Sequence, residues 1–157
     1  MIRPYPLLLF LACFTQANAQ SEEREILHVI DRFFQSMTAR DTAAMSATLL
    51  RGGNLQIASL LGEEPAHERP FRDYLVQLSK GEERYVERYW NPQVNQPSPS
   101  IATATMEYDF HVDGRFSHCG VDVFTMVKQP DGWRIANVAY TRRTEGCRDS
   151  PLPPIDK

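Results

Sequence analysis

The first part of the chain has the hydrophobic spacing of helices. Residues 21–37 carry apolar side chains at steps of three and four, which places them along one wide stripe of a helix. Ser21 is a suitable N-cap, and the acidic residues after it suit the positive end of the helix dipole. Two shorter helices are expected, over residues 43–50 after a cap at Asp41 and over residues 70–81. The pattern therefore predicts three N-terminal helices.

The rest of the chain alternates with the period of strands. Residues 54–61 form a short alternating run between the second and third helices. Four longer runs rich in β-branched and aromatic residues follow, at residues 82–90, 101–112, 115–128 and 133–144. Asp113-Gly114 and residues 129–132 are hairpin signals between the last three runs. Prolines 92, 97 and 99 are expected to make the connection after residue 90 irregular.

The composition is that of one globular domain. The 157 residues are 42% hydrophobic and 24% charged, which is unlike a disordered segment. The formal net charge is -3 and no basic tract occurs, so a nucleic-acid partner is excluded, because phosphates require clustered Lys and Arg. Residues 20–147 are interpreted as the domain and residues 148–157 as a flexible Pro-rich tail.

The first nineteen residues have the pattern of a secretory signal peptide. Arg3 precedes an apolar run at residues 7–14, and Ala17-Asn18-Ala19 forms a small-residue cleavage site. Cleavage there would export the domain to the periplasm or the medium. The apolar run is shorter than the roughly 20 residues that span a bilayer, so no stable membrane association is expected. The alternative is a lipoprotein, because residues 10–13 loosely resemble a lipid-modification signal ending at Cys13.

Two cysteines remain after such cleavage. Cys119 and Cys147 would lie in an oxidising compartment, where paired thiols usually form a disulfide. Closing the loop between them would stabilise the fold by about 3–4 kcal/mol. Two buried free thiols are the alternative, and a metal site is disfavoured because no other ligand lies at short spacing.

The order of elements and the ending Asp131-Gly132-Trp133 resemble the nuclear transport factor 2-like superfamily, within it the SnoaL-like and lumazine-binding branches. The runs 117–124, 140–143 and 146–147 look like the exported bacterial members. The resemblance implies an α+β cone in which three N-terminal helices pack on a strongly curved, mixed and mostly antiparallel sheet. It also implies a pocket between sheet and helices and a homodimer through the sheet. It leaves activity open, because this fold carries isomerases, dehydratases, cyclases and binding proteins.

Counting from the predicted hairpins assigns residues to the two faces of the sheet. With Asp113-Gly114 and residues 129–132 as loops, Asp109 should lie opposite His118, and Phe124 opposite Asn137. One face then gathers polar residues, namely Glu107, Asp109, His118, Asp122, Asn137, Thr141 and Arg143, with Phe116, Phe124, Met126 and Ile135 toward its ends. The other face is mostly apolar and should pack on the helices, with Ala104, Met106, Tyr108, Phe110, Cys119, Val121, Val138 and Tyr140. A bulge at Gly120 would exchange the faces beyond it.

The candidate catalytic residues are His118, Asp122 and Asp31. An imidazole titrates near neutral pH, and a neighbouring carboxylate could orient His118 or act beside it as a base. The alternative for His118 is a solvent-facing or interface role on the polar face. Asp31, and with it His28, lies near the apolar stripe of the first helix, and in dehydratase-like relatives a carboxylate from that helix enters the pocket. The candidate ligand-binding residues are Tyr89, Trp90, Asp109 and Asn137.

No metal or cofactor is expected. His111 and His118 are seven residues apart and His67 precedes Glu68, but neither pattern supplies three converging zinc ligands. The sequence has no phosphate-cradling glycine loop and no Gly-x-Ser-x-Gly elbow.

Three functions remain open. The first is an exported protein that binds a small apolar or aromatic molecule, the second a cofactor-free lyase or isomerase, and the third a dimeric scaffold. An enzyme needs titratable groups converging in the cavity, a binder needs an open apolar cavity, and a scaffold needs a filled one.

The disulfide gives the first testable prediction. We expect that the mature protein, alkylated without reduction, gains no mass, because Cys119 and Cys147 are bonded to each other. Intact-mass spectrometry checks this, and two alkylated thiols would contradict it.

Overall fold

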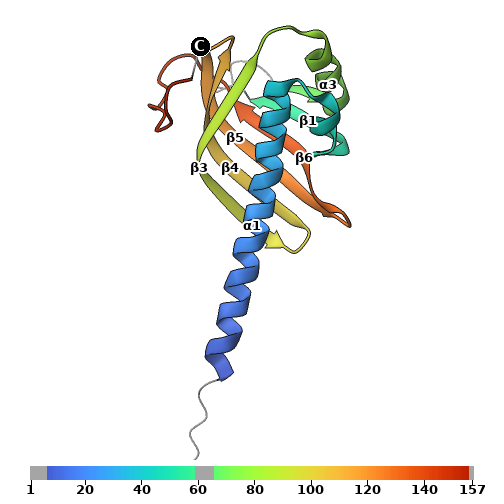
Figure 1. Cartoon of the computed structure of the whole chain (residues 1–157), viewed down its shortest axis with the longest axis vertical. Coiled ribbons are helices and arrows are strands. Elements are labelled where there is room, and N and C mark those ends of the chain that lie inside the picture. Colours follow the sequence, from blue (N-terminus) through green and yellow to red (C-terminus); the bar gives the residue numbers. More distant parts are fainter. Residues whose placement is uncertain (1–6, 59–65, 156–157) are drawn as a thin grey trace, which may run out of the picture.

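Helix α1 (Leu7–Ala39) lies lengthwise along a curved sheet, and its N-terminal part extends past the end of that sheet (Figure 1). The computed structural model describes residues 7–58 and 66–155, with side chains from residue 20 onward. The helix begins before the expected cap at Ser21 and runs through the expected cleavage site without a break, and cleavage itself stays a prediction. Of the helices in this described part, none combines the length and apolar character needed to cross a bilayer.

Two short helices complete the helical layer. Helix α3 (Phe71–Lys80) begins after Pro70 and ends at Gly81, as its sequence predicts. Helix α2 (Thr42–Ser46) is capped by the carboxylate of Asp41, but it ends four residues before the expected boundary. The expected helix over residues 43–50 is wrong at its end, because the backbone at Thr48 and Leu49 pairs with Ile135 on the sheet.

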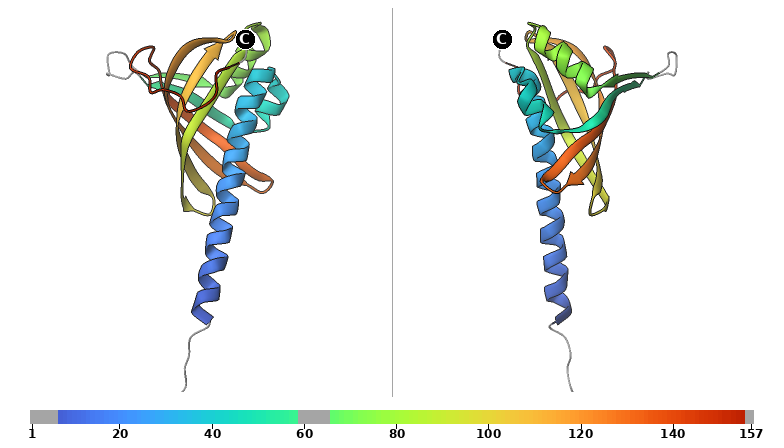
Figure 2. Two further views of the ribbon diagram at one scale, coloured as in Figure 1. Left: turned by 60° about the vertical axis from the view of Figure 1, so that its left-hand side comes forward. Right: turned by 90° about the vertical axis from the view of Figure 1, so that its right-hand side faces the viewer.

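Six strands form one mixed sheet. They are β1 (Leu49–Ala58), β2 (His67–Pro70), β3 (Tyr85–Ser98), β4 (Ile101–Val112), β5 (Arg115–Gln129) and β6 (Gly132–Thr141). Their order is β2-β1-β6-β5-β4-β3, and β1 and β6 are the parallel pair among otherwise antiparallel neighbours. Figure 2 shows the sheet curling around the helices on its inner face. The predicted α+β class with a mixed, mostly antiparallel sheet is thus confirmed. The first strand starts at Leu49 rather than at residue 54, and β2 was not expected from the sequence.

The expected irregular connection after residue 90 is instead part of β3. The strand continues to Ser98 with register shifts after Trp90 and after Asn95, each next to a proline. Proline is tolerated there because β3 is an edge strand, whose outward N–H groups need no partner.

The apolar stripe of α1 packs on the inner face of the sheet. Ile26, Ile30 and Met37 are almost fully buried. Phe33 and Phe34 meet the ring of Phe124 on β5 edge to face, with centroids 6.0 and 5.7 Å apart. This layer of side chains fixes the helix across the sheet.

One extra residue in β5 changes the expected register of the β4–β5 hairpin. Val112 lies opposite Arg115 as expected, but Ser117 has no partner on β4, so Phe110 lies opposite His118. The expected pairing of Asp109 with His118 is therefore wrong, and the bulge occurs at Ser117 rather than at Gly120. As a result His118 and Asp122 point to the inner face, whereas Cys119 and Val121 point outward.

A second irregularity shifts β6. Lys128 lies opposite Trp133 as expected, but a register shift after Met126 places Phe124 opposite Val138 instead of Asn137. Val138 and Tyr140 consequently face the helices, as the sequence predicts, while Asn137 lies on the other face of the sheet.

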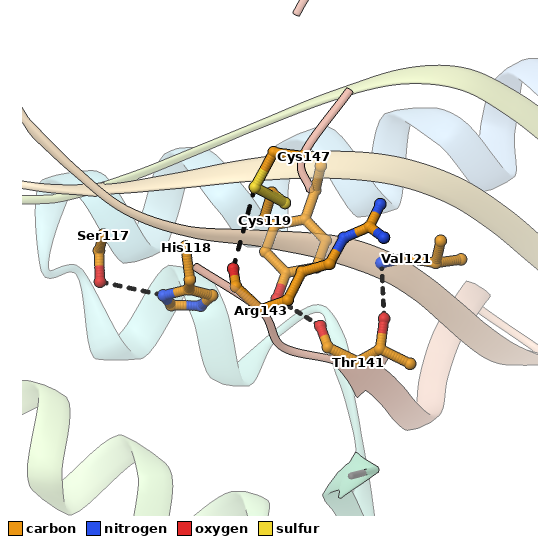
Figure 3. The surroundings of a disulfide bond; sticks show 8 residues. Ser117, His118, Cys119, Val121, Thr141, Arg143 and Cys147 are labelled. Carbon is orange, nitrogen blue, oxygen red and sulfur yellow. Dashed lines mark hydrogen bonds between the residues drawn. A yellow bond between two sulfur atoms is a disulfide. The ribbon is translucent and has the colours of Figure 1, made fainter. Parts of the chain in front are cut away.

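The outer face carries the predicted disulfide. Cys119 on β5 is bonded to Cys147, with Cα atoms 6.0 Å apart. The Cys119 sulfur and the His118 ring lie on opposite sides of the β5 ribbon (Figure 3).

The segment after β6 continues across this face. Arg148 forms an ion pair with Glu107 on β4 at 2.8 Å, and Arg88 on β3 donates to the carbonyl of Pro153. Residues expected to form a flexible tail thus contact two strands.

One carboxylate near the middle of α1 holds the helix to the sheet. Glu22 on α1 accepts hydrogen bonds from Lys128 at 2.5 Å and from the indole of Trp133 at 2.9 Å. The Lys128 ammonium also lies 5.5 Å from the centroid of the Trp133 ring. These bonds lower the pKa of Glu22.

Replacing this carboxylate should weaken the fold. Because the pKa of Glu22 is lowered in the folded state, its stabilisation is present above pH 4.5 and is lost as the pH falls through the folded pKa. Glu22→Gln should therefore lower the free energy of unfolding at pH 7 by about 1 kcal/mol, since the group is partly exposed. Urea denaturation measures this. The exposed Glu25→Gln is the matched control, and equal losses in the two variants would contradict the assignment.

Candidate functional site

A cavity of about 300 Å³ lies between the inner face of the sheet and helices α1 and α3. Side chains from all six strands and from two helices line it. The aromatic members include Phe33, Phe34, Tyr74, Tyr85, Tyr108 and Tyr140. From α1 it receives only apolar groups, so its polar groups come from the sheet, from α3 and from Arg142 directly after β6. The arrangement resembles small-molecule sites, which are mainly apolar with few polar groups.

Two carboxyl groups from different strands meet in this cavity. Glu87 on β3 and Asp122 on β5 are joined by a side-chain hydrogen bond. Asp122 is 2% exposed, and Glu87 lines both this cavity and a neighbouring groove between α1 and β3. Oδ2 of Asp122 is buried and has no hydrogen-bond partner among the described residues. Because two ionised carboxylates have only acceptors, the hydrogen bond between Glu87 and Asp122 requires a proton on one of them.

Burial favours that proton. Desolvation raises the pKa of Asp122, and it raises the pKa of Glu87 well above its ordinary value, with further contributions from the charges of Asp122 and Asp109. Two hydrogen-bonded carboxyls in a desolvated site cannot both ionise readily. Burial therefore favours a state in which the two carboxyls share a proton.

Tyr108 on β4 is bonded to the end of β6. Its hydroxyl donates to the carbonyl oxygen of Thr141 at 2.8 Å. This bond passes over β5 at Gly120, the residue that pairs with Tyr108. A Cβ at Gly120 would lie 2.0 Å from that carbonyl oxygen and 2.8 Å from the Tyr108 ring. Gly120 is thus required for close approach rather than for a bulge. Burial raises the pKa of Tyr108, so its hydroxyl keeps its proton.

His118 lines the cavity but is not bonded to Asp122. Its Nδ1 lies 3.0 Å from the hydroxyl of Ser117, and its ring stacks on Phe110 with centroids 4.8 Å apart. The residue is 8% exposed. Burial, with a smaller contribution from Arg142, lowers the pKa of His118 to about 4, so the imidazole is neutral at neutral pH. The two predicted catalytic residues share a cavity without forming the oriented pair that the sequence suggested.

The third candidate, Asp31, lies at a neighbouring groove. It accepts a hydrogen bond from the Tyr89 hydroxyl at 2.8 Å, and both residues line the space between α1 and β3. Leu152 of the C-terminal segment lines the same groove. The carboxylate of α1 therefore does not enter the central cavity, and His28 is exposed.

The other proposed ligand-binding residues make contacts elsewhere. Asp109 forms a bidentate ion pair with Arg88, with bonds of 2.9 and 2.5 Å. Asn137 donates to the backbone and side chain of Asn54, which joins β6 to β1. Trp90 is buried opposite Glu107 and lines none of the cavities described here.

Sequence reasoning missed Glu87, which is the partner of Asp122. A signal was present, because Tyr85, Glu87 and Tyr89 alternate along β3 and share one face, so a carboxylate interrupts an aromatic row. Arg69 and Arg142, which line the cavity beside Tyr140, were also not singled out. Within the described residues no group of three His, Cys, Asp or Glu side chains could hold a metal ion.

Comparison with known proteins gives a family and a fold. The family model described as "Putative lumazine-binding" matches residues 21–141. A search of curated proteins found no match.

Solved structures with this architecture are numerous. A nuclear transport factor 2-like protein from Novosphingobium aromaticivorans has a TM-score of 0.65 at 17% identity, over 90% of this chain and 92% of that chain. A nuclear transport factor 2-like superfamily protein from Salmonella enterica has a TM-score of 0.63 at 18% identity, over 82% and 95%. A protein of unknown function from Mycobacterium tuberculosis has a TM-score of 0.67 at 11% identity, over 81% and 75%. At these identities the similarity establishes the fold alone.

The burial of His118 predicts the pKa of its imidazole. We expect its imidazole to titrate near pH 4 because burial disfavours the charged form, and Asp122→Asn should leave this pKa unchanged. Arg142→Gln should raise it, since a nearby positive charge is removed. NMR titration of the ring protons measures both effects, with His118→Gln to assign the signal. A pKa near 6.5 that moves with Asp122→Asn would contradict the geometry.

Proposed function

Since the chain belongs to the family described as "Putative lumazine-binding", within the nuclear transport factor 2-like superfamily, we propose that its cavity binds a small aromatic molecule. The observation that carries this proposal is the cavity of about 300 Å³, walled by aromatic side chains from both helices and sheet. An open cavity of this kind favours a binding role over that of a scaffold, whose core would be filled. The leader-like N-terminus supports binding outside the cytoplasm.

The free energy of burying an aromatic ligand shows how much binding must come from polar groups in the cavity. Burying an aromatic molecule of about 150–250 Å² would contribute about 4–6 kcal/mol. Association itself costs at least about 4 kcal/mol in lost translational and rotational freedom. Apolar contact alone therefore gives weak binding, and useful affinity requires hydrogen bonds inside the cavity.

A second candidate is a cofactor-free lyase or isomerase. One observation favours it: a carboxyl pair that holds a proton and a neutral imidazole face the same cavity. Such displaced pKa values are typical of acid and base catalysts, and they also occur in binding sites. Release of a chemically changed molecule after incubation would distinguish catalysis from binding.

Filling the cavity should abolish binding. Lumazine, the bicyclic heteroaromatic compound in the family's description, is the first probe, with naphthalene as an apolar probe of similar size. Val138 lies in the cavity wall and is 3% exposed, so Val138→Phe should weaken binding of both probes at least tenfold. Calorimetry or ligand fluorescence measures this.

The chain offers a matched control for that substitution. Val76 on α3 is 52% exposed and does not line the cavity, so Val76→Phe should leave binding unchanged. Because an added ring can strain a core by about 1–3 kcal/mol, Ile57→Phe serves as a second blocking variant if Val138→Phe is unfolded. Failure of the wild-type protein to bind either probe, or equal binding by all variants, would overturn the proposal.

A further inference from the structure

The carboxyl pair faces the cavity without a cation bonded to it. Glu87 and Asp122 are bonded to each other, and neither has an ion-pair partner among the residues that the structure describes. Any negative charge on the pair lies in a desolvated site. A buried charge without a partner is costly, so its presence calls for an explanation.

Asp109 shows how this fold treats a buried carboxylate with a structural role. It is 5% exposed, it lies on the outer face, and Arg88 neutralises it with two parallel bonds. Asp122 is buried at least as deeply but receives no such support. The difference between these two carboxylates is that Asp122 lines a cavity.

The donors and acceptors of the pair indicate what is missing. One shared proton makes one bond between the two carboxyl groups, and the remaining oxygen lone pairs are acceptors. The Tyr108 hydroxyl donates to Thr141, and Nδ1 of His118 lies next to Ser117. Among the described residues, Arg69 of the cavity wall donates to Gln77, and no donor reaches Oδ2 of Asp122. The pair therefore presents at least one unpaired acceptor oxygen, Oδ2 of Asp122, to whatever occupies the cavity.

We propose that the Glu87–Asp122 pair is the specificity element of the cavity and selects ring compounds that carry an N–H or O–H hydrogen-bond donor. This inference rests on the proposed binding function and names the ligand class within it. A donor on the ring completes the hydrogen bonding of Asp122, and the aromatic walls hold the ring in place. A compound of the same shape without a donor leaves the buried acceptors unpaired, which is costly.

Two probes differ in this property. Lumazine carries ring N–H groups, whereas 1,3-dimethyllumazine carries methyl groups in their place. The wild-type protein should bind lumazine at least tenfold more tightly than the dimethyl compound. Asp122→Asn and Glu87→Gln should each reduce that preference to less than threefold, because an amide replaces an acceptor oxygen by a donor.

The control variant replaces a carboxylate that lies outside the cavity. Asp31 bonds to Tyr89 and lines the neighbouring groove, so Asp31→Asn should preserve the tenfold preference. Circular dichroism and intact mass check that each variant is folded and disulfide-bonded. Asp122→Asn is nearly isosteric and removes a buried charge, and Glu87→Gln gives an independent test at the other carboxyl.

The outcomes separate this inference from the proposed function. If naphthalene binds and Val138→Phe blocks it, but lumazine and its dimethyl derivative bind equally, the cavity is a binding site and the carboxyl pair does not select its ligand. A preference that persists in both carboxyl variants overturns the inference in the same way. If no probe binds at all, the proposed function itself fails.

Discussion

The contact of α1 with Phe124 at the centre of the inner face is the constraint on which the cavity depends. Phe33 and Phe34 close on that ring from the helix, and the apolar side chains on the N-terminal side of this contact form a dry core. On its C-terminal side, α3 and the curved strands stay apart and leave the cavity open. The same helix thus fills one end of the cone and forms a wall at the other, so the core and the cavity depend on one apolar stripe.

Desolvation gives the polar groups of the cavity their character. The enclosure that makes aromatic contact favourable also raises the pKa of the two carboxyls and lowers that of His118. The cavity wall therefore combines a neutral imidazole and a carboxyl pair that favours a shared proton with the two arginines Arg69 and Arg142. Asp109, a buried carboxylate with a structural role, lies instead on the outer face beside Arg88. The sheet therefore separates Asp109 from the carboxyls of the cavity.

The sequence was sufficient to predict the class of fold, helices α1 and α3, the hairpin loops and the disulfide. These features depend on local patterns, such as apolar spacing, Asp-Gly turns and two cysteines that follow a leader-like N-terminus. The start of β1 and the bulge at Ser117 depend instead on pairing with other strands, which no local pattern predicts. One unpaired residue was enough to turn His118 and Asp122 inward. Glu87 was missed because a single charge in a strand usually indicates solvent, whereas here it faces a carboxyl from two strands away.

The disulfide has a consequence for oxidative folding. Side chains alternate along β5, so Cys119 faces outward, toward Cys147, only when its neighbours His118 and Gly120 face inward. The disulfide and the cavity lining therefore require the same strand register. A nascent strand that slipped by one residue would turn the Cys119 thiol toward the helices, where Cys147 cannot reach it. Thiol oxidation therefore stabilises the register in which the cavity forms, and the disulfide on the outer face selects for the correct arrangement of the inner face.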